Sequence, residues 1–183
     1  FPKPQKRPRV DRETIEPKIF IESMADDPIL KSYKMFPLHP YQKRVKDRLI
    51  TSVLERGNHA LVHMPTGSGK TKTSIEALVD FWRSRGEGEG YIVWLAHTKE
   101  LCMQAYETFR YIWRARGDTS IDMAKLFEGH MPDLETMRHG IVFAGFQKLS
   151  SIIKSIHNNP GLNSLPSRNA RQLKHGTRIV VID

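Results

Sequence analysis

The stretch Val62-His63-Met64-Pro65-Thr66-Gly67-Ser68-Gly69-Lys70-Thr71 decides the fold. The apolar run that leads into it, His59 to Met64, predicts a buried strand. The helix expected from Lys70 onward places apolar residues on one face, namely Ile75, Leu78, Val79 and Trp82. A strand, a glycine-containing loop and a helix in this order are the context in which such a motif predicts a phosphate site.

The loop contains the residue types that a nucleotide triphosphate requires. Gly67 and Gly69 let the backbone N–H groups turn inward as an anion nest, and the start of the helix adds partial positive charge. Lys70 supplies a cation for the β- and γ-phosphates, and Thr71 supplies a hydroxyl for Mg²⁺. The alternative, a chance Gly/Ser turn before an amphipathic helix, is disfavoured by the elements on both sides.

Composition indicates one domain with an extension. The chain has 183 residues, of which 39% are apolar, enough to bury a core. The single cysteine, Cys102, allows no internal disulfide, which favours a reducing, cytoplasmic compartment such as the bacterial cytosol. Cys102 lies in a helical apolar pattern and is expected in the core. No apolar run approaches the ~20 residues of a membrane span, so we expect no membrane partner.

The positive charge is concentrated in two segments. Residues 1–9 carry four Lys or Arg residues without an acid, and residues 136–182 carry seven without an acid. These segments together carry a charge of +11, and the net charge of the chain is +9, so the remaining residues have a net charge of −2. Segregated positive charge suits nucleic acid, and a solvated basic surface is the equally weighted alternative.

Further strands are expected from apolar, β-branched runs separated by helical patterns. They are Tyr91–Ala96, Ile121–Phe127, Ile141–Ala144 and Thr177–Asp183. This alternation predicts an α/β fold with a parallel sheet, helices on both faces, and ligands at the carboxyl ends of the strands. We expect a long surface loop over 158–176, a mobile tail over 1–9 and a short helix from Pro28 to Lys34.

A further helix precedes the loop. Leu38-His39-Pro40-Tyr41-Gln42 opens an amphipathic pattern that Gly57 ends. The amide of Gln42 could pair with the N6 and N7 edge of adenine. A solvent-facing glutamine is the alternative, and spacing alone favours it.

Together these motifs resemble the first RecA-like domain of a superfamily-two helicase. The order of motifs over 38–183 is similar to that domain, with residues 1–37 as an N-terminal extension. The general P-loop has Gly where this chain has Met64, and Pro-Thr-Gly-Ser-Gly-Lys-Thr is the superfamily-two form. His97-Thr98-Lys99-Glu100-Leu101 differs from the Pro-Thr-Arg-Glu-Leu of DEAD-box proteins. The motif sequences are more similar to those of the DEAH-like branch, which includes bacterial repair helicases and restriction-enzyme motors.

The resemblance implies a role for each matching residue. The cofactors would be ATP and Mg²⁺, with Gln42 at adenine and Pro65, Thr66, Gly67, Ser68, Gly69, Lys70 and Thr71 around the phosphates and metal. Asp183 would open motif II and hold the metal through water, so that Lys70 and Asp183 are the catalytic pair. Nucleic-acid contacts would come from Thr98, Lys99, Gly145, Gln147 and Lys148.

The implied activity is that of an ATP-dependent helicase or translocase acting on DNA, which is favoured over RNA. The resemblance also implies a second RecA-like domain and subunits of a repair, restriction or defence complex as partners. Because motif II only opens at Asp183, we expect the sequence to be part of a larger motor and to be inactive alone. Two alternatives remain, a P-loop ATPase switch for protein partners and a non-catalytic nucleotide- and nucleic-acid-binding module.

Overall fold

The computed structural model describes residues 19–22, 31–34, 37–85, 90–158, 161 and 163–183, in two units, Phe1–His39 and Pro40–Asp183. In the first unit, β1 (Ile19–Glu22) pairs antiparallel with β2 (Lys31–Lys34), and Phe20 lies opposite Tyr33. All other elements belong to the second unit. Within the described residues, no helix is both long enough and apolar enough to cross a membrane.

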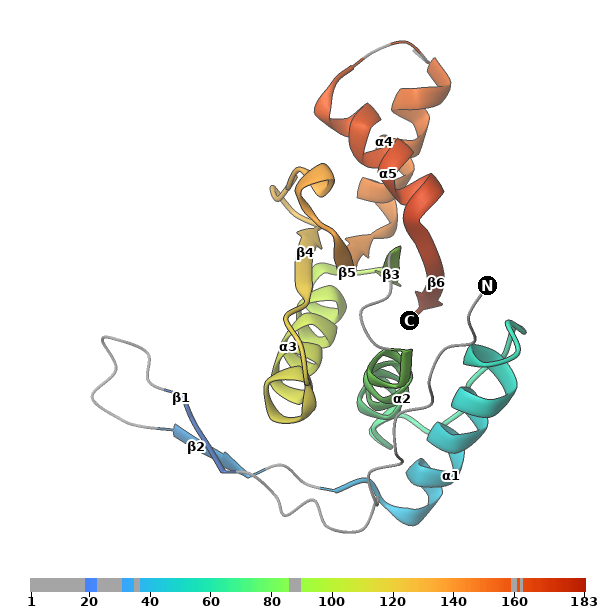
Figure 1. Cartoon of the computed structure of the whole chain (residues 1–183), viewed down its shortest axis with the longest axis vertical. Helices are drawn as coiled ribbons and strands as arrows, with labels where there is room; N and C mark the ends of the chain where they lie inside the picture. The colour runs from blue at the N-terminus through green and yellow to red at the C-terminus, as the bar shows by residue number, and fades with distance from the viewer. Residues whose placement is uncertain (1–18, 23–30, 35–36, 86–89, 159–160, 162) are drawn as a thin grey trace, which may run out of the picture. The chain divides into compact units, whose positions relative to one another are not determined.

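A parallel four-stranded sheet forms the centre of the second unit (Figure 1). Its order is β4 (Asp122–Leu126), β5 (His139–Gly145), β3 (Gly90–Ala96) and β6 (Thr177–Ile182). Every residue of β3 is buried, as its continuous apolar run predicts. The four expected strands are therefore confirmed, and so is the parallel α/β architecture.

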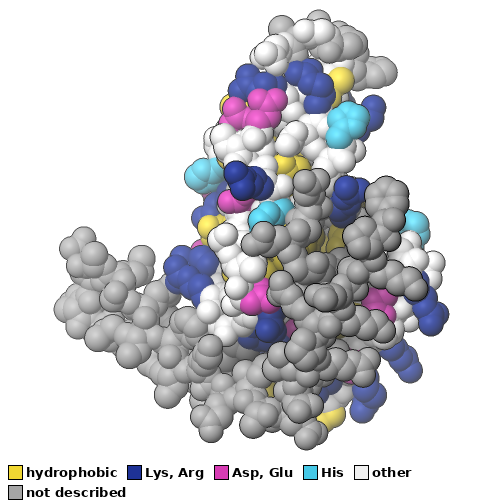
Figure 2. Space-filling view, in the orientation of Figure 1, with side chains coloured by type: hydrophobic (Ala, Val, Ile, Leu, Met, Phe, Trp, Pro, Cys, Tyr) yellow, Lys and Arg dark blue, Asp and Glu magenta, His cyan; other side chains and the backbone are white. Residues whose placement is uncertain are grey.

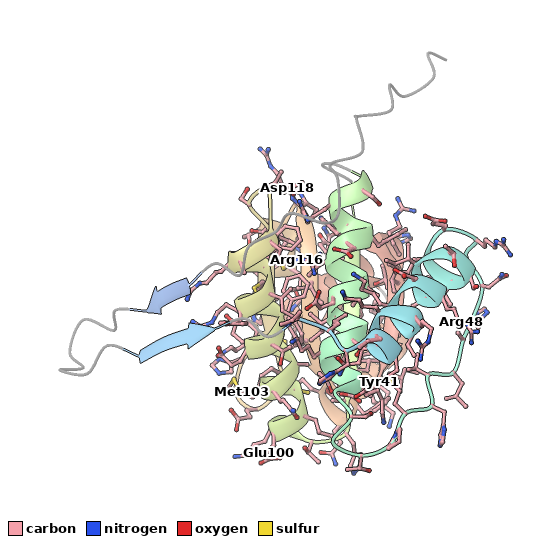
Figure 3. The ribbon with its side chains drawn as sticks, turned by 90° about the horizontal axis from the view of Figure 1, so that it is seen from below. Tyr41, Arg48, Glu100, Met103, Arg116 and Asp118 are labelled. Carbon is pink, nitrogen blue, oxygen red and sulfur yellow. The ribbon has the colours of Figure 1, made fainter. Side chains whose placement is uncertain are left out.

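Helices α2 (Lys70–Arg85) and α3 (Lys99–Arg116) cover one face of the sheet. Ile92, Trp94 and Ala96 of β3 point to this face and pack in one core with the apolar stripes of both helices. Helix α1 (Pro40–Leu49) packs on α2 and continues into a π-helical turn, Ile50–Leu54. Figure 3 shows α2 between α1 and α3.

The opposite face is covered by α4 (Phe146–Asn158) and α5 (Leu165–Gly176), which pack as a hairpin. Val93 and Leu95, the alternate residues of β3, point to this face. They meet Ile152 of α4 and Leu173 of α5 in a second core. Helices on both faces are thus confirmed.

The prediction of a strand over His59–Met64 is wrong. These residues belong to no strand, and Leu61 is 93% exposed, although Met64 is buried. A strand is stable only when a neighbour pairs with its backbone. In the described part of the chain, the sheet ends at β6 on one side and at β4 on the other, and neither pairs with this segment.

Two further expectations near the ends of the chain need correction. The expected loop over 158–176 is largely the helix α5, because Ser164 caps it by accepting from the Ser167 N–H, and Pro166 occupies its first turn. The helix expected from Pro28 to Lys34 begins outside the described residues, and its last four residues form β2. The tail over 1–9 also lies outside them.

Candidate nucleotide and nucleic-acid site

The loop between Met64 and α2 has the conformation that its glycines predict. Gly67 and Gly69 have φ angles of 77° and 81°, a left-handed region that costs glycine little. Ser68 closes the turn, since its backbone N–H and its hydroxyl donate to the Pro65 carbonyl at 3.1 and 2.6 Å. The loop, with Thr66 exposed, leads directly into Lys70, the exposed first residue of α2. The N-terminus of α2 is therefore accessible to an anion.

Thr71 and Asp183 lie side by side although 112 residues separate them. The Thr71 hydroxyl donates to Asp183 Oδ2 at 3.4 Å, and the Asp183 N–H donates to the Leu95 carbonyl at 2.8 Å. No group of three or more His, Cys, Asp or Glu side chains suited to a metal occurs among the described residues. One hydroxyl and one carboxylate fit Mg²⁺, because this ion keeps several waters and needs few protein oxygens.

Helix α1 contacts the loop directly. Gln42 Nε2 and the Tyr41 hydroxyl donate to the Ser68 carbonyl at 2.7 and 3.0 Å. A Cβ on Gly69 would lie 2.5 Å from Gln42 Nε2, so the glycine also makes room for this amide. Gln42 is buried, which rules out the solvent-facing alternative. It lies against the phosphate loop, where a nucleotide would bind.

The residues expected to bind nucleic acid after β3 have defined local partners. The Thr98 hydroxyl caps α3 by accepting from the Leu101 N–H at 3.3 Å. Lys99 Nζ lies 3.1 Å from Glu128 Oε1, and this hydrogen bond raises the pKa of Lys99 above its usual value. A phosphate that binds Lys99 would therefore compete with the Glu128 carboxylate.

The second expected group of nucleic-acid residues lies on the neighbouring strand. Gly145 is the last residue of β5 and lies in register with Ala96, the last residue of β3. Gln147 is exposed and Lys148 half-buried, both in the first turn of α4. The structure thus brings these residues and Thr98 to the same edge of the sheet as Asp183.

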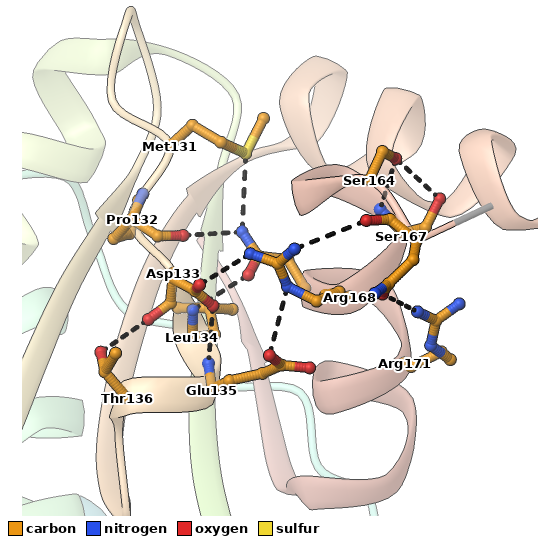
Figure 4. A network of polar contacts seen from close by, with 12 residues as sticks. Met131, Pro132, Asp133, Leu134, Glu135, Thr136, Ser164, Ser167, Arg168 and Arg171 are labelled. Atoms are coloured by element: carbon orange, nitrogen blue, oxygen red, sulfur yellow. Dashed lines mark hydrogen bonds and ion pairs between the residues drawn. The ribbon is translucent and has the colours of Figure 1, made fainter.

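The basic segment over 136–182 is partly neutralised on folding. Arg168 lies 2.8 Å from Asp133 Oδ2 and 3.2 Å from Glu135 Oε2, both just outside that segment (Figure 4). The resulting hydrogen bond lowers the pKa of Asp133 and raises that of Arg168. Figure 2 shows acidic side chains among the Lys and Arg side chains on the visible face. At Arg168 the positive charge of this segment is therefore offset by acidic residues that lie outside it.

A network of partly buried charges that joins α1, α2 and α3 was not expected from the sequence. Arg116 of α3, which is labelled in Figure 3, contacts Glu76 and Asp80 of α2. Lys46 of α1 lies 2.7 Å from the other oxygen of Asp80. The only signal in the sequence is two carboxylates four residues apart on one helix. Their partners lie on other helices, which no local pattern reveals.

Cys102 lies on the buried side of α3. Burial raises the pKa of its thiol above the ordinary cysteine value. Since the thiolate is the reactive form, the side chain is an unreactive core residue, as its helical pattern predicts.

The comparisons with known proteins agree with this geometry. A family profile described as "Type III restriction enzyme, res subunit" matches residues 35–183. The chain belongs to this family. A search of curated proteins finds no match. The resemblance to a superfamily-two RecA-like domain is confirmed, and the family implies an ATP-binding, helicase-like motor domain.

Proposed function

We propose that this chain is the ATP-binding half of a superfamily-two motor that couples ATP hydrolysis to translocation along DNA or to its unwinding. The observation that carries the proposal is the approach of Thr71 to Asp183 at 3.4 Å beside the phosphate loop. A hydroxyl and a carboxylate at that position suit the metal of a bound Mg²⁺–ATP. The family description names a restriction-enzyme subunit, which favours DNA as the polymer and other subunits as partners.

In this proposal the backbone N–H groups of residues 66–70 and the Lys70 ammonium would bind the phosphates. Thr71 and Asp183 hold Mg²⁺ with water, and Gln42 lies at the base. Bound Mg²⁺–ATP supplies the phosphoryl group and neutralises its charge, so the protein contributes mainly positioning. We expect a second RecA-like domain to be required for turnover.

Nucleic acid would lie along the carboxyl edge of the sheet. Thr98 and Lys99 follow β3, Gly145 ends β5, and Gln147 and Lys148 follow β5; the last residues of the two strands are paired in register. Backbone N–H groups, hydroxyls and cations at such a position suit phosphate contacts, which carry affinity without reading sequence.

Substituting Lys70 tests the nucleotide site. Lys70→Ala should weaken Mg²⁺–ATP binding about tenfold to a hundredfold, the range for losing one charged hydrogen bond. Titration with a fluorescent ATP analogue measures it, and Lys43→Ala, an exposed lysine of α1, is the matched control. Unchanged affinity in Lys70→Ala would refute the site.

An ATPase assay of the complete motor with and without DNA separates the proposal from a protein-directed switch. A DNA motor should be stimulated by DNA, and the apparent affinity for DNA should fall with added salt because phosphate contacts release counterions. Equal turnover with and without DNA would instead favour the switch.

A further inference from the structure

Helix α1 is held in place mainly by polar contacts. Of its ten residues, Gln42 is the buried one, while Val45 and Leu49 are half-buried. A helix with so little buried apolar surface receives little of its position from the hydrophobic core. Its hydrogen bonds and ion pairs must therefore define where it lies.

Two such contacts attach one face of α1 to the rest of the domain. Gln42 donates to the Ser68 carbonyl at 2.7 Å, and Lys46, four residues later on the same face, lies 2.7 Å from Asp80. The first contact is with the phosphate loop, and the second is with α2, which begins where that loop ends. The two contacts together fix both the position and the rotation of α1.

Asp80 is itself held firmly. Its second oxygen contacts Arg116, which also contacts Glu76, and all three side chains are half-buried or buried. Because Arg116 of α3 holds one oxygen of Asp80, the carboxylate cannot shift freely if α1 moves. Asp80 is therefore a fixed anchor for Lys46.

We propose that Lys46 is a positioning residue of the phosphate loop: through its ion pair with Asp80 it sets the position of α1, and through Tyr41 and Gln42 it fixes the Ser68 carbonyl. The inference rests on the proposed function, because it concerns the same nucleotide site. Its target is the loop backbone, so the loss of Lys46 should weaken the binding even of a ligand that has no base.

The experiment compares Lys46→Met, Lys46→Arg and Lys43→Met in competition titrations with Mg²⁺ and inorganic tripolyphosphate, ATP or GTP. Lys46→Met should weaken the binding of tripolyphosphate, ATP and GTP, each by about threefold to tenfold, which is the loss expected when one partly buried ion pair acts on the loop through α1. Lys46→Arg should recover most of this loss because it keeps the cation. Lys43→Met should match the wild type.

Several outcomes would overturn the inference. Unchanged tripolyphosphate affinity in Lys46→Met would show that the phosphate loop does not depend on Lys46. A change only in the ratio of the affinities for ATP and GTP would place the effect at the base. Circular dichroism checks that each variant is folded. Tyr41→Phe removes the 3.0 Å hydrogen bond to the Ser68 carbonyl and should also weaken the binding of tripolyphosphate. Failure of the wild type to bind any nucleotide would instead refute the proposed function.

Discussion

The helices on the two faces of the sheet are held by arginine–carboxylate networks that differ in their exposure to water. On the α2–α3 face, Arg116 joins two carboxylates of α2, and the side chains of Arg116 and Glu76 are 12% and 5% exposed. On the α4–α5 face, Arg168 joins Asp133 and Glu135, with Arg168 and Asp133 27% and 35% exposed. The chemistry is the same, and the access of water differs.

This difference determines what each arginine contributes. A buried carboxylate that loses its cation remains desolvated, whereas an exposed carboxylate is rehydrated. On the α4–α5 face the buried polar residues, Ser167 and Asn169 of α5, are instead neutral. Asn169 accepts from the Leu134 N–H at 2.9 Å and donates to the Pro132 carbonyl at 2.7 Å. The comparison predicts a ranking of stability losses that mutagenesis can test.

The largest effect is expected at Arg116. Arg116→Met should lower the free energy of unfolding by about 3–5 kcal/mol, because Glu76 stays buried without its cation. Urea denaturation measures this loss. Arg110→Met, which removes an i,i+3 surface pair with Glu107 on the same helix, is the control and should cost about 0.5 kcal/mol or less. Equal losses in the two variants would contradict the comparison.

A smaller loss is expected at Asn169. Asn169→Ala leaves a backbone donor and a backbone acceptor without their amide partner, which should cost about 2–4 kcal/mol. The same denaturation experiment applies, with the exposed Asn163→Ala as control. A loss below that of the control would mean that water replaces the amide at this position.

The smallest effect is expected at Arg168, and it should depend on pH. The pKa of Asp133 is lowered by its hydrogen bond to Arg168, so the stabilisation is present above the ordinary aspartate value of 3.8 and is lost as pH falls below it. Arg168→Met should therefore destabilise the protein slightly at pH 7. The difference from wild type should shrink as the pH falls below 3.8. A difference that is constant across this range would show that Arg168 acts by packing alone.

The sequence predicted what depends on local pattern. The continuous run Tyr91–Ala96 is β3, and the glycine loop precedes α2 as expected. Ligands were expected at the carboxyl ends of the strands, and the hydrogen bond from the Asp183 N–H to the Leu95 carbonyl places Asp183 beside the carboxyl end of β3. Short-range periodicity carries this information because burial repeats with the period of the element.

What the sequence did not reveal depends on distant partners. His59–Met64 has the composition of a strand, but pairing decides whether a strand forms, and pairing is not local. The α5 helix was missed because polar composition outweighed the Ser164 and Pro166 start signals. The network of Lys46, Asp80 and Arg116 joins three helices. The roles of the site residues remain predictions for the experiments above.

The burial of Cys102 gives the chain a built-in chemical reporter. It is the single thiol, it is inaccessible in the core beneath the candidate site, and burial raises its pKa. A maleimide dye should consequently label only molecules whose α3 has opened. The rate of labelling would then report how often α3 opens in each variant, without any engineered cysteine.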